Sequence, residues 1–254
     1  MVMITIKNKD SIEKMSRAGS LLLEVFDAIK PIIKPGISTE AIDTFIEDEL
    51  KKRDLVSKCK GYHGYRHVSC ISVNDVVVHG VPSPNTLLKN GDLVKVDICV
   101  SWNGYCADMA RPYVVGVVSD ATKKFIAVAQ QALDRGIEKA RAGNHLTDIS
   151  AAIQKEVESN GYGVVRDFAG HGIGKQMHED PEILNYGKPG KGPILRPGMT
   201  FAIEPMITFG KYDVFITDDG WTVKTSDKSL AMHVEDTVLI TDSDPVILTR
   251  RTIE

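Results

Sequence analysis

The sequence lacks the features that mark secreted and membrane proteins. Its four cysteines include no C-x-x-C pair, and no apolar segment approaches the ~20 residues that a transmembrane helix needs. The first residues, MVMITIKNKD, contain too short an apolar run for a signal peptide. We therefore expect reduced cysteines and a cytoplasmic location.

An excess of charge of one sign is also absent. The 31 Lys and Arg residues nearly balance the 34 Asp and Glu residues, which gives a net charge of −3. This balance argues against a nucleic-acid partner and against an anionic membrane surface. The hydrophobic content of 43% and the charged content of 26% are ordinary for a globular protein. We predict a single catalytic domain over residues 1–254, and we expect it to be a monomer.

The periodicity of the apolar residues predicts an α+β protein. Residues 12–33 and 121–141 fit long helices, and shorter amphipathic stretches follow Gly36 and Gly143. Apolar runs at residues 94–100, 201–207 and 233–240 fit buried strands.

One offset of 107 residues relates positions in the two parts of the sequence. It separates Gly36 from Gly143 (143 − 36 = 107) and Asp97 from Glu204 (204 − 97 = 107). The same offset also relates Gly91 to Gly198, Ile42 to Ile149, Ile46 to Ile153 and Glu49 to Glu156. We therefore predict two related halves, about 10–115 and 118–240, which each deliver an acid to the middle. The alternative is a chance likeness, because helix–turn–strand sequences often look alike.

Three of the apolar runs carry acidic residues, namely Asp97, Glu204 and Glu235. A desolvated carboxylate needs a compensating charge, and the only nearby basic residue is Lys95, which alternation puts on the strand face of Asp97. Asp108 lies 11 positions after Asp97, across an Asn-Gly hairpin signal that can bring both acids to one face. Two carboxylates so placed repel unless they share a proton or a cation.

His171 completes a set of four acids and one imidazole. It stands in the sequence GHGIG, whose glycines let the backbone approach closely; a nucleotide-binding loop is the competing interpretation, but the P-loop pattern is absent. The oxygen-rich set contains no thiolate, which favours two divalent ions such as Mn²⁺, Fe²⁺ or Co²⁺, with Zn²⁺ also possible, over a closed structural zinc site. Paired ions can hold a hydroxide and polarise a carbonyl, so the set suggests hydrolysis. For any single acid, the alternative is a structural hydrogen-bonded carboxylate.

Further residues could serve the same site. His79 and His178 could donate hydrogen bonds or shuttle protons. An apolar pocket could be lined by aromatic and sulfur side chains, although core packing is the alternative for each: Cys59, Tyr62, Tyr65, Cys70, Met177 and Trp221. The remaining histidines are interpreted as structural or surface residues: His63, His67, His145 and His233.

From about residue 9 to residue 249 the sequence resembles the type I methionine aminopeptidases. The segments that carry this resemblance include GYHGY at 61–65, VHGVP at 78–82, GHGIGK at 170–175, GMTFAIEPMI at 198–207 and WTVKT at 221–225, together with Asp97, Asp108 and Glu235. The resemblance implies the "pita-bread" fold, with two pseudo-two-fold halves, a curved antiparallel sheet and outer helices. The sequence departs from the family pattern at Cys106-Ala107, Ala169 and Met177, and these differences put the metal affinity and the pocket shape in doubt.

The resemblance also implies roles for the residues of the site. Asp97 would chelate one metal ion, His171 and Glu204 would hold the other, and Asp108 and Glu235 would bridge the two. His79 and His178 would contact the substrate, and the six pocket residues would accept a methionine side chain. A metal-bridging hydroxide would attack the carbonyl of an N-terminal methionine, and Glu204 would pass the proton toward the leaving amine.

The implied substrates are the N-termini of nascent polypeptides that have a small second residue. The enzyme would encounter them at the ribosome. Two rival functions share the fold. One is a proline dipeptidase or aminopeptidase P, and the other is a non-catalytic binding protein, against which five intact ligands and the net charge of −3 argue.

Overall fold

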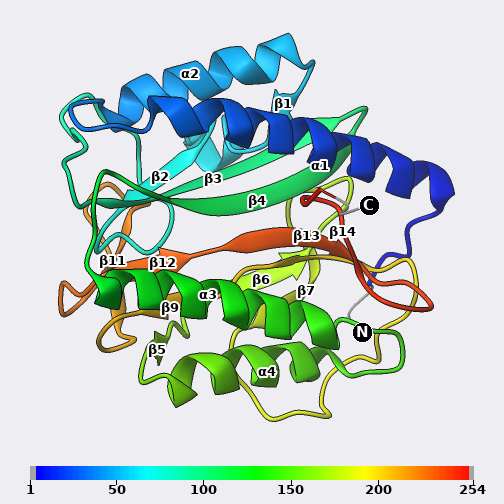
Figure 1. Cartoon of the computed structure of the whole chain (residues 1–254). Coiled ribbons are helices and arrows are strands. Elements are labelled where there is room, and N and C mark those ends of the chain that lie inside the picture. The colour runs from blue at the N-terminus through cyan, green and yellow to red at the C-terminus, as the bar shows by residue number, and fades with distance from the viewer. Residues whose placement is uncertain (1–3, 252–254) are drawn as a thin grey trace.

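The computed structural model describes residues 4–251, in which four α-helices cover a curved antiparallel sheet (Figure 1). The helices are α1 (Lys9–Ile29), α2 (Thr39–Lys52), α3 (Asp120–Lys139) and α4 (Leu146–Ser159). The side chains of Asn8, Ser38 and Ser119 cap the first three by accepting a hydrogen bond from a backbone amide of the first turn. The predicted helix at 12–33 ends earlier, at Ile29, and a 3-10 turn (Lys30–Ile32) follows, because Pro31 has no amide hydrogen to continue the helical hydrogen bonds.

The main sheet contains nine strands, and all of their pairings are antiparallel. Its path runs in the order β1-β3-β4-β13-β8-β6-β7, while β2 pairs with β3 and β14 pairs with β13. The strands are β1 (Val56–Ser57), β2 (Cys70–Val73), β3 (Leu93–Trp102), β4 (Tyr105–Val114), β6 (Ala169–Gly172), β7 (Glu179–Leu184), β8 (Thr200–Ile203), β13 (Glu235–Leu239) and β14 (Val246–Ile247).

Two smaller sheets lie beside the main one. Strands β5 (Gly163–Val164), β9 (Met206–Thr208) and β12 (Ala231–His233) form a sheet in the order β12-β9-β5. Strands β10 (Val214–Ile216) and β11 (Val223–Thr225) form a separate pair. The predicted strands at 201–207 and 233–240 are therefore each divided: β8 ends before Glu204 and Pro205, and β12 and β13 are separated at Val234. Pro205 cannot donate to a strand ladder, which favours the first break.

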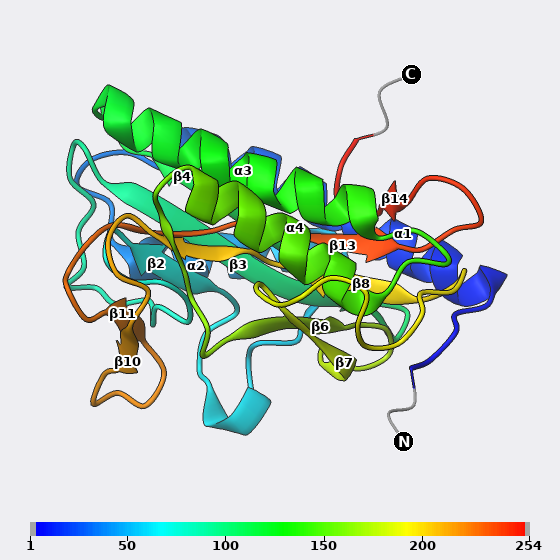
Figure 2. The same ribbon diagram turned by 90° about the horizontal axis from the view of Figure 1, so that it is seen from below.

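The alternation of side chains along the strands separates a helix-facing side from an opposite side. Val94, Val96 and Ile98 of β3 pack in a core with residues of α1 and α2. Phe201 and Ile203 of β8 pack in a second core with residues of α3 and α4. In Figure 2 the pair β10–β11 and the 3-10 turn η2 (Tyr62–Gly64), drawn in cyan, extend on the side of the sheet away from α3 and α4. The opposite face of the central strands is thereby left for polar side chains.

Elements of the two predicted halves correspond in the structure. Helices α2 and α4 have 14 residues each and begin at Thr39 and Leu146 (146 − 39 = 107). Strands β3 and β8 begin at Leu93 and Thr200 (200 − 93 = 107), and they flank β4 and β13 at the centre of the sheet. That residues 1–254 form a single catalytic domain stays a prediction. Within residues 4–251, no helix is long and apolar enough to cross a membrane.

Candidate metal centre

The strand registers bring the predicted metal ligands to one face of the sheet. Ala110 of β4 pairs with Asp97 on one side and with Glu235 on the other. Directly paired residues, and residues two apart on one strand, share a face, so Asp97, Asp108 and Glu235 point the same way. Thr237, two residues beyond Glu235, pairs with Ala202, which in turn pairs with His171.

His171 lies on β6 between two strands that leave no room for side chains on its neighbours. A Cβ atom on Gly170 would lie 2.4 Å from the Ala202 carbonyl oxygen. A Cβ atom on Gly172 would lie 2.1 Å from the Asp180 carbonyl oxygen. The glycines of the GHG sequence are therefore required by close strand packing, which holds the imidazole in place.

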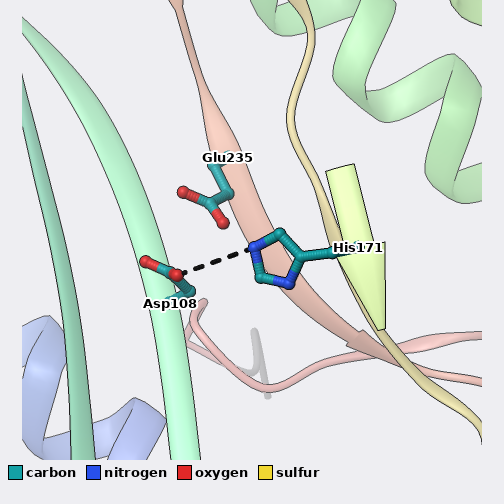
Figure 3. A group of neighbouring side chains, drawn as sticks. All are labelled: Asp108, His171 and Glu235. Carbon is teal, nitrogen blue, oxygen red and sulfur yellow. Dashed lines mark ion pairs between the residues drawn. The ribbon is translucent and has the colours of Figure 1, made fainter. Parts of the chain in front are cut away.

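The ligand atoms of these residues lie close together although they come from different strands. Possible ligand atoms of Asp108, His171 and Glu235 all lie within 4.8 Å of one another (Figure 3). The Nε2 atom of His171 is 3.9 Å from Oδ2 of Asp108 and 3.5 Å from Oε1 of Glu204. Four of the five predicted ligands thus converge directly.

The fifth predicted ligand, Asp97, is electrostatically coupled to the other acids. Burial raises the pKa of Asp97 well above its usual value, and the neighbouring charges of Asp108 and Glu204 raise it further. The same two causes, burial first, raise the pKa of Glu235. Burial likewise raises the pKa of Asp108 to about 7, with a further contribution from Glu204. A group of carboxylates in this arrangement favours shared protons or bound cations.

The one nearby lysine does not neutralise the acids. Lys95 is 1% exposed, and its Nζ atom donates to the backbone carbonyl of Asn74 at 2.9 Å. Burial lowers the pKa of Lys95 to about 7, which means that the charged ammonium form of Lys95 is itself destabilised. Within residues 4–251 no ion pair joins Lys95 to an acid. These acids therefore need a cation other than Lys95 to compensate their charge.

His171 presents a free nitrogen to the acids. Its Nδ1 atom lies 2.9 Å from the carbonyl oxygen of Gly172, which can only accept, so Nδ1 carries the hydrogen. The other nitrogen, Nε2, faces Asp108 and Glu204. Burial lowers the pKa of His171 to about 3, which keeps the imidazole neutral. This is the tautomer and protonation state of a metal ligand.

The donor set fits divalent cations. Oδ1 of Asp108 and Oε1 of Glu235 are buried and make no hydrogen bond within the described residues. Buried carboxylate oxygens without partners are costly, and a coordinated cation would satisfy them. Carboxylate oxygens with one imidazole suit hard or borderline divalent ions.

His233 is a member of this cluster, and its interpretation as a structural or surface residue was incomplete. It ends β12, is 2% exposed, and its Nε2 atom lies 3.2 Å from Oε2 of Glu204. Possible ligand atoms of Glu204, His233 and Glu235 form a second group within 4.8 Å of one another. The only signal in the sequence was its position two residues before Glu235, which alternation places on the same face.

All of the predicted site residues line one cavity of 660 Å³. The acidic cluster with His171 lies against it, together with His79 and His178. The remaining lining residues from the sequence prediction are Cys59, Tyr62, Tyr65, Cys70, Met177 and Trp221. Five of these six pack in one apolar cluster or against it: Cys59, Tyr65, Cys70, Met177 and Trp221.

His79 is held in an uncommon backbone conformation at the cavity. Its φ of 57° lies in the left-handed region, which is unusual for a residue with a Cβ atom. Its ring packs edge-on against Phe168, with the centroids 5.6 Å apart. Burial lowers the pKa of His79 to about 4, with His233 and His178 adding to the effect, so the imidazole is neutral near pH 7.

His178 is paired with Tyr62 across the cavity wall. The Tyr62 hydroxyl lies 3.0 Å from Nδ1 of His178. If this hydroxyl donates, the hydrogen of the imidazole stands on Nε2, where it can be donated to another group. Burial lowers the pKa of His178, and the neighbouring His63 lowers it further.

The cavity also has an outer rim that the sequence did not predict. Its lining includes the exposed side chains of Arg166, Asp167, Asp180 and Glu182. No pattern in the sequence marks these residues, because they come from short connections and from β7.

Comparisons with known proteins agree with this geometry. A model of the metallopeptidase family M24 matches residues 13–242. The chain is 48% identical over 247 residues to a methionine aminopeptidase of Clostridium acetobutylicum, which covers 97% of this chain and 99% of that protein. A crystal structure of methionine aminopeptidase from Thermotoga maritima has a TM-score of 0.96 and 41% identity, covering 98% of this chain and all of the other.

A prolidase from Pyrococcus furiosus is more distant. Its TM-score is 0.79 at 25% identity, and the match covers 98% of this chain but 66% of the prolidase. These structural likenesses confirm the predicted α+β fold class with its curved antiparallel sheet. The match of the family model over most of the sequence and the identity to full-length relatives establish that this chain belongs to metallopeptidase family M24.

Proposed function

We propose that this chain is a metal-dependent aminopeptidase that removes the N-terminal methionine from polypeptides with a small second residue. One observation carries the proposal: a single cavity joins an acid and imidazole cluster to an apolar group of sulfur and aromatic side chains. The cluster is suited to hydrolysis, and the apolar group is suited to an unbranched thioether side chain. The relative from Clostridium acetobutylicum, at 48% identity, bears the name methionine aminopeptidase and supports the choice of substrate.

The proposed cofactor is a pair of divalent ions, with Mn²⁺, Fe²⁺ and Co²⁺ favoured and Zn²⁺ possible. Asp97 would chelate one ion, His171 with Glu204 would hold the other, and Asp108 with Glu235 would bridge them. When bound, the ions would polarise the scissile carbonyl and lower the pKa of water. The orphaned oxygens of Asp108 and Glu235 are the structural support for bridging.

The side chains of the chain divide the remaining tasks. Glu204 would accept a proton from the attacking water and return it to the leaving amine. Its carboxylate lies between the imidazoles of His171 and His233, at 3.5 Å and 3.2 Å, which restricts its orientation. His79 and His178 would donate hydrogen bonds to the reacting peptide, since both imidazoles line the cavity. Asp97 would attract the free α-amine, which would restrict cleavage to N-termini.

Neutral histidines suit this role at pH 7. A neutral imidazole can donate one hydrogen bond without adding a buried charge. The pKa of His79 is lowered to about 4, chiefly by burial, so protonation does not compete above pH 5. We expect the substrates to be nascent polypeptide N-termini, met at the ribosome in the cytoplasm by a monomeric enzyme.

A peptide assay after metal removal and add-back tests this function. The chain is stripped with a chelator, reloaded anaerobically with Mn²⁺, Fe²⁺, Co²⁺ or Zn²⁺, and offered Met-Ala-Ser, acetylated Met-Ala-Ser and Ala-Pro. We expect metal-dependent release of methionine from Met-Ala-Ser alone. Cleavage of Ala-Pro in its place would favour the proline peptidases, whose fold this chain shares. No cleavage with any metal would overturn the proposal.

Two histidine variants test whether His79 takes part in the reaction. His79→Ala removes a group that lines the cavity, and we expect kcat to fall by about 10²–10⁴-fold, the usual contribution of a positioned proton donor. His145→Ala is the matched control, because His145 precedes α4 and its Nδ1 atom bonds to the Gly192 carbonyl, while its side chain does not line the cavity. Unchanged turnover of the His79→Ala variant would exclude the catalytic role of His79.

A further inference from the structure

The segment that precedes α1 places a buried ammonium group against the loop that carries Met177 and His178. Nζ of Lys7 lies 2.7 Å from Oε2 of Glu179, and the two side chains are only 6% and 14% exposed. The Thr5 hydroxyl donates to the same Oε2 atom at 2.6 Å, and Lys7 also donates to Thr5. In Figure 2 this segment runs from α1 toward the N-terminus on the side of the sheet where β7 and β8 lie.

The other oxygen of Glu179 closes the loop itself. Oε1 accepts hydrogen bonds from the backbone amides of Lys175 at 2.8 Å and Gln176 at 3.3 Å. The amide of Gly174 donates to the Gln176 carbonyl at 3.1 Å within the same turn. Glu179 therefore joins the segment before α1 to residues 174–176, immediately before the two cavity-lining residues Met177 and His178.

The surrounding backbone is shaped to admit this ion pair. A Cβ atom on Gly174 would lie 2.5 Å from Cε of Lys7 and 2.6 Å from Oε1 of Glu179. The amide of Lys7 donates to the Gly198 carbonyl at 2.8 Å, which fixes the segment to the residues just before β8. Lys7 is thus held at its backbone and at its side chain.

The charges in this contact support each other. Burial acts to raise the pKa of Glu179, but the hydrogen bonds from Lys7, Thr5 and the Gln176 amide, together with the charge of Lys7, hold the pKa below its usual value. Charge-assisted hydrogen bonds of this length are stronger than neutral ones. Removing the ammonium group would leave a largely buried carboxylate without its counter-charge.

We propose that Lys7 and Glu179 are positioning residues for the substrate cavity, because their ion pair fixes the loop that sets Met177 and His178 in the cavity wall. The proposal rests on the proposed aminopeptidase function for its kinetic consequence. Its structural consequence, an ordered loop at 174–178, does not depend on that function. Neither residue touches the reacting atoms.

The test replaces Lys7 by methionine, which keeps much of the side-chain length and removes the charge. We expect kcat/KM for Met-Ala-Ser to fall about ten- to a hundredfold, the effect of a small misplacement of groups that orient a substrate. Trypsin should cleave faster after the exposed Lys175, while cleavage after the exposed Lys191 stays unchanged. Lys7→Arg should restore both readouts, since it restores the positive charge. The matched control is Lys123→Met, which breaks a surface ion pair. In that pair the side chains of Lys123 and Asp120 are 63% and 97% exposed.

The two readouts separate the possible results. Unchanged kcat/KM and unchanged cleavage after Lys175 would overturn the proposal. A lower melting temperature without either change would assign Lys7 a purely structural role and would also overturn it. If wild-type protein does not cleave Met-Ala-Ser, the proposed function fails, and cleavage after Lys175 still decides whether the ion pair orders the loop. Should Lys7→Met not fold, Thr5→Val removes one donor to Glu179 and takes its place in both measurements.

Discussion

Asp108 shows most directly how a proposed metal ligand affects the stability of the metal-free protein. It is 5% exposed, its Oδ1 atom makes no hydrogen bond within the described residues, and burial raises its pKa from 3.8 to about 7. A raised carboxyl pKa means that the folded state binds the proton more tightly than the unfolded state. Its stabilising contribution is therefore complete below pH 3.8 and is lost as the pH rises through about 7.

We predict that Asp108→Asn stabilises the metal-free protein at pH 8 and removes its stabilisation by metal. The amide cannot ionise, so the free energy of unfolding should rise by about 1–4 kcal/mol at pH 8, with a smaller gain toward pH 5. Urea denaturation of the chelated protein between pH 5 and pH 8 measures this difference. Asp242→Asn, at an exposed acid, is the control. A variant that is less stable than wild type at pH 8 would contradict the assignment of Asp108 to an uncompensated cluster.

At the scale of residues, the sequence predicted the acids better than their surroundings. Asp97, Glu204 and Glu235 were recognisable because each is a charge in or beside an apolar run. His233 carries no such contrast, because a lone histidine in a strand is usually structural. Its bond of 3.2 Å to Glu204 depends on the pairing of β12 with β9, which is a contact between distant segments.

At the scale of elements, the sequence of β6 is tightly constrained by the neighbouring strands β7 and β8. We predict that Gly170→Ala lowers stability by about 1–3 kcal/mol, the usual cost of an extra methyl group in a packed interior. The new Cβ atom would lie 2.4 Å from the Ala202 carbonyl oxygen and 3.3 Å from Cγ of Glu204. The strand must move, so the affinity for Co²⁺, measured by titration of the stripped protein, should fall as well.

A glycine in an open turn provides the comparison for Gly170. Gly104, in the β3–β4 turn, has a φ of +79°, and a Cβ atom there would meet nothing within 4 Å. Gly104→Ala should cost about 1–2 kcal/mol of left-handed backbone strain and leave Co²⁺ affinity unchanged. Equal Co²⁺ affinities for wild type and Gly170→Ala would show that β6 tolerates the methyl group without moving its ligand.

The strands also show which boundaries the local sequence can predict and which it cannot. The single run at 94–100 was identified correctly because its alternation continues through β3 without interruption. The runs at 201–207 and 233–240 were predicted as strands, yet each is divided between the main sheet and the β12-β9-β5 sheet at the candidate metal centre. Pro205 is the only local sign of this break, and no residue near Val234 announces the second one.

At the scale of the whole molecule, the candidate metal centre joins the two predicted halves. Asp97 and Asp108 come from β3 and β4, while His171, Glu204 and Glu235 come from the later part of the chain. Within the main sheet, strands β4 and β13 meet at the centre, where Ala110 pairs with Glu235. The offset of 107 residues predicted that both halves supply acids, but only the register shows that they share one face.

We therefore predict that divalent metal stabilises the entire fold. At a free concentration of about 100 times the dissociation constant, a bound ion adds about 2.7 kcal/mol to the free energy of unfolding. For a protein of this size that gain corresponds to a rise of about 5–10 °C in the melting temperature, measured by calorimetry of the chelated and Mn²⁺-loaded protein. Glu235→Gln should abolish the rise, because Glu235 contributes to both ligand groups. Glu182→Gln, at an exposed acid of the same cavity, should keep it in full. Equal melting temperatures with and without metal would mean that the five side chains do not bind a cation strongly enough to unite the halves.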